Sequence, residues 1–211
     1  MNVNPFPYSL YLVISEADCM GKNFLEVAEQ AILGGVDIIQ LREKKDSTEA
    51  FLQKAMQLIE ITNKYGIPLI INDNITVTEQ VNSAGIHVGN SDETPQNLRK
   101  RPLLRDKMIG YSIEYLEQIN NEQTAVADYL GISPIFRTKT KTDTVTEWGL
   151  EGISQIKQLT EKPLVAIGNI HLENARSVIN AGADCLAVVS EICSATNPQK
   201  AAYELKNEIV K

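Results

Sequence analysis

The chain has 211 residues, of which 43% are hydrophobic and 22% are charged, as in a single globular domain with a sizeable core. Its 20 basic and 27 acidic residues give a net charge of −7, which argues against a general nucleic-acid-binding or anionic-membrane surface. The three cysteines lack metal-finger spacing, and the N-terminus lacks the charged and apolar regions of a signal peptide. We therefore expect a cytoplasmic protein with reduced thiols.

Short apolar segments alternate along the chain with segments of helical spacing. Eight apolar segments are predicted strands: residues 8–15, 37–43, 68–73, 86–89, 108–113, 128–136, 163–169 and 184–190. Helices are predicted most clearly over residues 23–33 and 47–65, with Ser47 as the N-cap of the second. Because the strand segments are almost continuously apolar, they are typical of parallel strands covered on both faces.

Glycines follow several predicted helices at the positions of helix C-caps: Gly34–Gly35, Gly66, Gly85 and Gly182. This repeated joint predicts an α/β fold, a single (β/α)₈ TIM barrel over residues 1–211. An open, doubly wound sheet is the structural alternative. Against it, the first predicted strand is not followed by a GxGxxG or Walker-type loop.

Polar residues cluster where the predicted strands end. In a parallel barrel these ends form the functional face. The polar ends are Gln40 to Lys44, Asn72–Asp73, Asn90 to Asp92, Ser112, Thr138 to Lys141, Gly168–Asn169 and Val189–Ser190. Arginine and lysine neutralise phosphate oxygens, and two carboxylates suffice for Mg²⁺ when substrate phosphates supply further ligands. The combination predicts a Mg²⁺ and diphosphate site.

Each of these features has an alternative interpretation when it is taken alone. Arg42 and Lys44 could be ordinary surface charges at a strand end. Asp73 could make a turn or cap the next helix, and Asp92 could precede a helix. Residues 137–147 could form a solvated loop. Their joint occurrence at one level of a barrel favours a binding site.

Other conspicuous residues are expected to have structural roles. His87 is predicted to be a packed or hydrogen-bonded barrel residue rather than a base, and His171 to begin a helix. Trp148 is expected to pack against the barrel rim, and Cys185 to lie in the core. No Ser-His-Asp order or GxSxG motif indicates acyl chemistry.

Together these segments resemble the thiamine phosphate synthase family over nearly the whole chain. The matching motifs are QLREK at 40–44, IND at 71–73, HVGNSD at 87–92, GYS at 110–112, GISPIFRTKTK at 131–141, WGLEG at 148–152, VAIGNI at 165–170 and GADCLAVVS at 182–190. The family joins a hydroxymethylpyrimidine diphosphate to a thiazole phosphate, giving thiamine phosphate and diphosphate. Its reaction is understood as departure of diphosphate followed by attack of the thiazole nitrogen.

The resemblance also implies roles for individual residues. It implies substrate binding by Gln40, Leu41, Arg42, Glu43, Lys44, Asn72, Ser112, Thr138, Lys139, Thr140, Lys141, Gly168, Asn169, Val189 and Ser190. Catalytic roles are implied for Arg42, Lys44, Ser112 and Lys141, and Mg²⁺ ligation for Asp73 and Asp92. The implied partners are therefore small-molecule substrates, with no nucleic acid and no membrane; whether the chain forms a homo-oligomer is left open.

One position departs from the family's pattern. Asn169 stands where the family usually has a second glycine. Its backbone N–H could still donate to phosphate and asparagine tolerates positive φ, but its side chain narrows the pocket. The alternatives are a thiazole tautomerase with the same barrel and a non-catalytic ligand-binding barrel. The presence of Lys44, Asp73, Asp92 and Lys141 favours the synthase over both.

Overall fold

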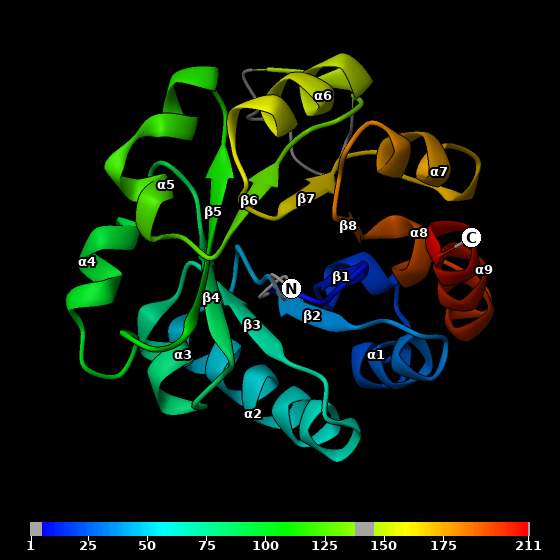
Figure 1. Cartoon of the computed structure of the whole chain (residues 1–211). Coiled ribbons are helices and arrows are strands. Elements are labelled where there is room, and N and C mark those ends of the chain that lie inside the picture. Colours follow the sequence, from blue (N-terminus) through cyan, green and yellow to red (C-terminus); the bar gives the residue numbers. More distant parts are fainter. Residues whose placement is uncertain (1–5, 138–145, 211) are drawn as a thin grey trace.

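The computed structural model describes residues 6–137 and 146–210, which form a closed barrel of parallel strands surrounded by helices (Figure 1). The strands are β1 Leu10–Ile14, β2 Ile38–Leu41, β3 Leu69–Asn72, β4 Gly85–Val88, β5 Met108–Ile113, β6 Tyr129–Ile132, β7 Leu164–Ile167 and β8 Cys185–Val188. The α-helices are α1 Phe24–Leu33, α2 Thr48–Tyr65, α3 Ile75–Gln80, α4 Pro95–Lys100, α5 Glu122–Val126, α6 Gly149–Leu159, α7 Leu172–Asn180, α8 Ser190–Cys193 and α9 Pro198–Val210. Two 3₁₀ turns are η1 Ala17–Cys19 and η2 Leu116–Asn120.

Strand β8 pairs with β1 and closes the barrel, which confirms the predicted fold class and excludes the open doubly wound sheet. Alternate residues of each strand face opposite sides. In β1, Leu10, Leu12 and Ile14 pack outward against the helices, whereas Tyr11 and Val13 pack inside the barrel. Both faces are buried, which explains the continuous apolar character of the strand segments. None of the helices in the described ranges combines the length and apolarity that a bilayer span needs.

Most predicted helix ends are confirmed. The Ser47 hydroxyl accepts the Ala50 N–H at 3.2 Å and caps α2, which ends at Gly66 with φ of 68°. Gly182, with φ of 116°, follows the end of α7. The prediction for Gly85 was wrong: this residue begins β4, and a Cβ there would lie 2.2 Å from the Met108 carbonyl oxygen. It is the close approach of β5, and not a helix end, that requires glycine here.

Several strands are shorter than the apolar segments that predicted them. The sixth was expected over residues 128–136, but β6 ends at Ile132. Pro134 follows shortly afterwards and has no N–H to donate to a neighbouring strand. The ladder is therefore interrupted at Pro134, although the Ile135 N–H still donates to the Ile167 carbonyl at 2.9 Å, and Ser133 borders a cavity.

The residues expected to have structural roles have them. His171 is the N-cap residue of α7, and Trp148 is buried at the start of α6. Cys185 lies inside the barrel and is fully buried. Cys19 and Cys193 are buried too, and none of the three cysteines forms a disulfide within the described ranges.

Three aspartates make the same joint at the N-terminal end of the barrel. Each directly precedes a strand, accepts an N–H from the start of the preceding strand and pairs with a cation. The contacts are Asp37 with Leu10 N (2.9 Å) and Lys206 Nζ (2.6 Å), Asp128 with Ile109 N (2.6 Å) and Arg99 Nη2 (2.5 Å), and Asp184 with Leu164 N (2.9 Å) and Lys157 Nζ (2.8 Å). These joints tie neighbouring strands and the outer helices together at this end.

Candidate active site

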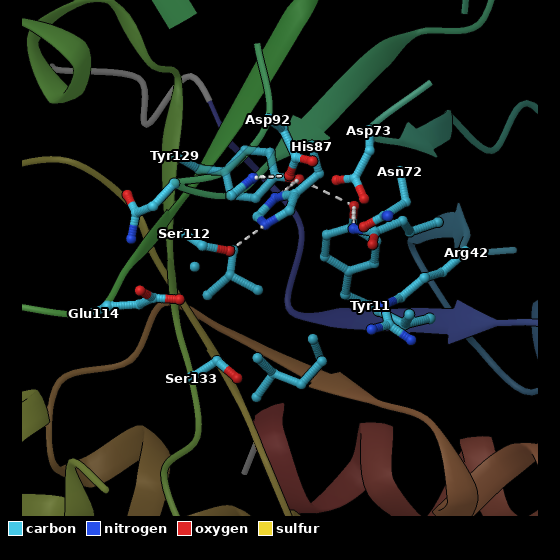
Figure 2. Close-up of a pocket in the computed structure, with 18 of the residues that line it drawn as sticks. Tyr11, Arg42, Asn72, Asp73, His87, Asp92, Ser112, Glu114, Tyr129 and Ser133 are labelled. Atoms are coloured by element: carbon cyan, nitrogen blue, oxygen red, sulfur yellow. Dashed lines mark hydrogen bonds between the residues drawn. The ribbon is translucent and has the colours of Figure 1, made fainter. Parts of the chain in front are cut away.

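Two adjoining cavities lie at the C-terminal ends of the strands. The larger has a volume of about 310 Å³ and is drawn in Figure 2; the smaller has a volume of about 90 Å³. Residues from β1, β7 and β8 and from the segments after β2 and β6 line both of them: Val13, Arg42, Ser133, Ile167 and Ala187. The barrel therefore places two hollows side by side at the face where TIM-barrel enzymes carry their sites.

Arg42 is the cation shared by the two cavities. It directly follows β2, and its backbone N–H donates to the Ile14 carbonyl at 2.9 Å, which fixes the start of the side chain. The side chain is half-buried, and its guanidinium has no hydrogen-bond or ion-pair partner among the residues that the structure describes. A half-buried guanidinium is satisfied best by a planar or tetrahedral anion, because its fork of donors matches carboxylate and phosphate oxygens.

Asp73 and Asp92 face each other across the rim of the larger cavity (Figure 2). Asp73 directly follows β3 with φ of 59°, and its N–H donates to the His87 carbonyl at 2.9 Å. The Asp92 carboxylate accepts the Gly89 N–H at 2.8 Å. Burial, and then the neighbouring Asp73 charge, raise the pKa of Asp92 above its ordinary value. Two carboxylates placed so close together favour a cation between them.

The alternative roles of these two aspartates belong to neighbouring residues. Asn74 caps α3, since its side chain accepts the Val77 N–H at 3.0 Å. Thr94 caps α4, directly before Pro95. Lys44 forms an ion pair with Asp73, so the cationic and acidic strand ends meet at one edge of the cavity.

Gln40, Asn72 and Ser112 line the inner part of the larger cavity. Gln40 and Asn72 are buried polar residues at the ends of β2 and β3. The Ser112 hydroxyl lies 2.9 Å from His87 Nε2. His87 also contacts the Tyr129 hydroxyl, which agrees with the prediction of a hydrogen-bonded barrel residue.

Gly168, Asn169, Val189 and Ser190 come together around the smaller cavity. Gly168 has φ of 121°, and a Cβ at this position would lie 2.6 Å from Pro134 Cβ, so both conformation and space require glycine. Asn169 follows with φ of 50°, which shows that asparagine adopts the left-handed conformation expected at this position. Backbone from β7 and β8 therefore surrounds this cavity.

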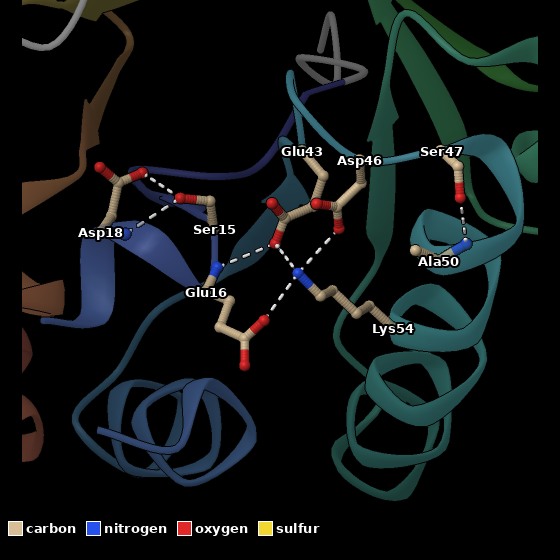
Figure 3. Close-up of polar contacts among 8 residues, drawn as sticks. All are labelled: Ser15, Glu16, Asp18, Glu43, Asp46, Ser47, Ala50 and Lys54. Carbon is tan, nitrogen blue, oxygen red and sulfur yellow. Dashed lines mark hydrogen bonds and ion pairs between the residues drawn. The ribbon is translucent and has the colours of Figure 1, made fainter. Parts of the chain in front are cut away.

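Two predicted binding residues are not brought to either cavity. The Leu41 side chain is fully buried in the outer core between the barrel and its helices. The Glu43 carboxylate turns away from the cavity and accepts the Glu16 N–H at 2.9 Å (Figure 3). Side chains alternate across the chain at a strand end, so Arg42 and Glu43 point in different directions.

Lys54 of α2 holds this outward-facing carboxylate and was missed in the sequence (Figure 3). Its ammonium lies 3.1 Å from Glu43, 2.8 Å from Asp46 and 2.8 Å from Glu16. Burial acts to lower the pKa of Lys54, but the three carboxylates raise it more, so the net pKa is raised. A sequence signal did exist: Lys54 lies about two helical turns after the N-cap Ser47, on the same side of α2.

Tyr11 and Tyr129 also line the larger cavity and were missed. Their hydroxyls are hidden within apolar strand segments, and only the alternation of inward and outward positions distinguishes them. The predicted residues Thr138, Lys139, Thr140 and Lys141 lie outside the described residues.

The fold and the two cavities define a (β/α)₈-barrel protein with a charged small-molecule site at its strand ends. A family model described as thiamine monophosphate synthase matches residues 10–192, and the chain belongs to this family. It is 46% identical over 200 residues to a thiamine-phosphate synthase of Albidiferax ferrireducens, covering 95% of this chain and 91% of that protein. A thiamine-phosphate synthase of Shouchella clausii is 42% identical, covering 94% and 95%.

Among solved structures, the chain is similar to a thiamine phosphate pyrophosphorylase from Pyrococcus furiosus. The TM-score is 0.86 and the identity 28%, over 96% of each chain. The sequence resemblance is thereby confirmed at the level of the family and of the fold.

Proposed function

We propose that this chain is a Mg²⁺-dependent transferase that joins 4-amino-2-methyl-5-(diphosphooxymethyl)pyrimidine to thiazole phosphate, giving thiamine phosphate and diphosphate. The observation that carries the proposal is the position of Arg42, a half-buried cation lining both cavities. One cation between two cavities suits a reaction in which two phosphorylated substrates meet. The names of the two curated relatives and of the solved structure described above, thiamine-phosphate synthase and thiamine phosphate pyrophosphorylase, support the same reaction.

The reaction breaks the bond between the pyrimidine methylene carbon and the diphosphate oxygen, and the electron pair leaves with diphosphate. The lone pair of the thiazole nitrogen then forms the new carbon–nitrogen bond, so no general base is required. Arg42, Lys44 and Lys141 stabilise the negative charge that develops on the leaving group, and Ser112 donates a hydrogen bond to the pyrimidine ring. Holding the two substrates against each other supplies the rest of the rate enhancement.

Asp73 and Asp92 fit a Mg²⁺ ion in this proposal. No group of three or more potential metal-ligating side chains occurs in residues 6–137 and 146–210. The acidic pair therefore needs additional ligands, and diphosphate oxygens with water are those that Mg²⁺ takes most readily. When bound, Mg²⁺ supplies neutralising charge to the leaving diphosphate.

The remaining site residues divide between the two substrates. In the larger cavity Gln40, Asn72 and Ser112 hold the pyrimidine diphosphate with Arg42 and Lys44. In the smaller cavity Gly168, Asn169, Val189 and Ser190 hold the thiazole phosphate. By resemblance, Thr138, Lys139 and Thr140 complete that phosphate site.

The proposed setting is the cytoplasm, with small molecules as the partners. Three buried thiols without a disulfide in the described ranges agree with a reducing compartment. The net charge of −7 disfavours nucleic acid. A homo-oligomer is compatible with this proposal.

The direct test mixes the protein, both substrates and Mg²⁺, and measures diphosphate and thiamine phosphate. We expect both products in equal amounts. Folded protein that forms neither would contradict the proposal, and conversion of a thiazole alone would support the tautomerase alternative.

A variant of Asp73 distinguishes its proposed role in Mg²⁺ binding from the binding of thiazole phosphate. Asp73→Ala should abolish turnover while thiazole phosphate binding, followed by calorimetry, stays nearly intact. Asp106→Ala is the matched control, because this side chain is exposed and does not line either cavity. Equal loss of both properties in Asp73→Ala would mean that Asp73 is misassigned.

A further inference from the structure

Five polar side chains cross the floor of the larger cavity in one continuous row of hydrogen bonds. Each comes from a different strand: β2, β1, β6, β4 and β5. The links are Gln40 Nε2 to Tyr11 Oη (3.0 Å), Tyr11 Oη to Tyr129 Oη (3.0 Å), Tyr129 Oη to His87 Nδ1 (3.0 Å) and His87 Nε2 to Ser112 Oγ (2.9 Å). We call this row the relay; four of its members are labelled in Figure 2.

The two ends of the relay are the proposed pyrimidine-binding residues, and its two tyrosines are closed to water. Tyr11 is 1% exposed and Tyr129 is 0% exposed. Burial is the main cause that raises the pKa of both tyrosines above the ordinary value, so each keeps its single proton at physiological pH. A buried hydroxyl with one proton donates once, and its oxygen accepts from the other neighbour.

The amide of Gln40 sets the direction of the relay. Its nitrogen can only donate, so Tyr11 accepts from Gln40, and the order that uses every proton of the row has Tyr11 donating to Tyr129. Tyr129 then donates to His87 Nδ1. A neutral His87 consequently carries its proton on Nε2 and donates it to the Ser112 oxygen.

This order leaves opposite polarities at the two ends. The carbonyl oxygen of Gln40 accepts no hydrogen bond from the described part of the chain and remains an acceptor in the cavity. The Ser112 oxygen already accepts from His87, so its own proton is available to a ligand. Reversing the order requires the amide to flip, both hydroxyls to rotate and the His87 proton to move between nitrogens.

We propose that Tyr11, Tyr129 and His87 are positioning residues that fix an acceptor at Gln40 and a donor at Ser112, and so select an aminopyrimidine over an oxopyrimidine. The inference rests on the proposed function for the identity of the substrate. A 4-aminopyrimidine presents its amino donor on one side of the ring and a ring-nitrogen acceptor on the opposite side, which complements an acceptor and a donor at the two ends of the relay. The corresponding oxopyrimidine presents an oxygen acceptor in place of the amino donor, and is mismatched at the Gln40 end.

The direction of the relay can be measured without any substrate. The chain has only two histidines, so nitrogen-15 spectra of the imidazole rings are assigned by comparison with His171→Gln. We expect the neutral tautomer with the proton on Nε2 for His87, and a mixture of tautomers in Tyr129→Phe. A proton on Nδ1, or on both nitrogens, in the unmodified protein at neutral pH would overturn the proposal.

The kinetic test compares Tyr129→Phe with Tyr65→Phe. Tyr65 also donates a hydroxyl hydrogen bond, to Glu29 at 2.8 Å, but lies at the end of α2 and lines neither cavity. For Tyr129→Phe we expect KM for the pyrimidine diphosphate to rise about tenfold. KM for the thiazole phosphate and inhibition by inorganic diphosphate should stay within about twofold, because neither depends on the relay.

Specificity gives the decisive readout. The preference for the aminopyrimidine over the oxopyrimidine diphosphate should fall at least about tenfold in Tyr129→Phe and should be unchanged in Tyr65→Phe. Tyr11→Phe removes the hydroxyl that joins Gln40 to Tyr129 and should lower the preference in the same way. This second variant keeps the test valid if Tyr129→Phe does not fold. An unchanged preference in both variants, or a loss of kcat with every KM unchanged, would overturn the selective role.

The two proposals fail in different ways. If the unmodified protein forms no thiamine phosphate but His87 has its proton on Nε2, the proposed function is contradicted and the direction of the relay is supported. If it is an active synthase and His87 has its proton on Nδ1, the relay is contradicted and the function stands.

Discussion

The two ends of the barrel carry similar charged residues, but these residues differ in how far their charges are satisfied by partners within the protein. At the N-terminal end Asp37, Asp128 and Asp184 each accept a strand N–H and pair with a cation. At the C-terminal end Arg42 has no partner within the described residues, Asp73 pairs with Lys44, and burial followed by the Asp73 charge raises the pKa of Asp92. Paired charges tie strands together, whereas unpaired ones retain free energy for a ligand.

The comparison explains why the same residue types serve different purposes. Each N-terminal aspartate carries both a strand N–H and a cation, whereas at the cavity Asp73 pairs with Lys44 and Asp92 accepts the Gly89 N–H without a cation of its own. A half-buried guanidinium without a partner bears a desolvation cost that a bound anion offsets. Stability and binding are therefore separable by mutation in this barrel, with the relay lying between the two ends.

The largest expected effect comes from removing Arg42, a cation without a partner among the described residues. Arg42→Met should lower kcat/KM by about a thousandfold or more, because it removes charge stabilisation of both phosphate groups. The free energy of unfolding should be unchanged or slightly higher. Steady-state kinetics and thermal unfolding check this, with the exposed Arg105→Met as control. A large loss of stability with activity intact would remove the contrast between the ends.

Lys54 tests a strongly paired charge cluster behind the segment that carries Arg42. Lys54→Met leaves the Glu16, Glu43 and Asp46 carboxylates without their cation. We expect the free energy of unfolding to fall by about 3 kcal/mol. KM for the pyrimidine diphosphate should rise about tenfold, since the segment carrying Arg42 loses its anchor. Lys54→Arg should restore most of the free energy of unfolding and most of the affinity for the pyrimidine diphosphate. If it does not, the positive charge of Lys54 is not what holds this segment in place.

Asp37 tests the N-terminal end. Asp37→Asn should lower the free energy of unfolding by about 2 kcal/mol, because it removes charge-assisted bonds to Lys206 and to the Ser9 and Leu10 amides. Neither KM should change. Substrate kinetics that changed as much as those of Lys54→Met would contradict the separation of the two ends.

The stability lost in Asp37→Asn should depend on pH in a defined direction. Burial acts to raise the pKa of Asp37, but Lys206 and the two amides lower it more, so the net pKa is below the ordinary value. Its contribution is therefore complete above the unfolded pKa of about 3.9 and is lost as pH falls through the folded value. Denaturant titrations should show the difference between the two proteins constant from neutral pH to about pH 5 and shrinking below pH 4. A difference that grew on acidification would contradict this.

The smallest effect is expected at the smaller cavity. Asn169 already adopts a positive φ, so Asn169→Gly should change the free energy of unfolding by only about 0.5 kcal/mol. Removing the side chain should lower KM for the thiazole phosphate about twofold by opening the cavity. A tenfold rise instead would show that the Asn169 side chain binds the phosphate.

Much of the fold could be predicted from the sequence because it is encoded locally. Apolar segments of strand length, Ser47 before α2 and Gly66 and Gly182 after their helices each act within a few residues. Gly85 was misinterpreted because glycine is required there by the close approach of Met108 on the neighbouring strand, and not by a helix end.

The candidate site, too, has features that are encoded locally and features that depend on contacts between distant residues. The sequence by itself determined which polar residues stand at the strand ends, since each follows its own strand, and so it brought Arg42, Asp73, Asp92 and Ser112 to one face. Only the tertiary structure decided which charges are paired. Tyr11 and Tyr129 are 118 residues apart in the chain, yet closure of the barrel joins their hydroxyls. A hydrogen bond or an ion pair depends on distances of a few ångströms between separate strands and helices, and no local pattern records such distances.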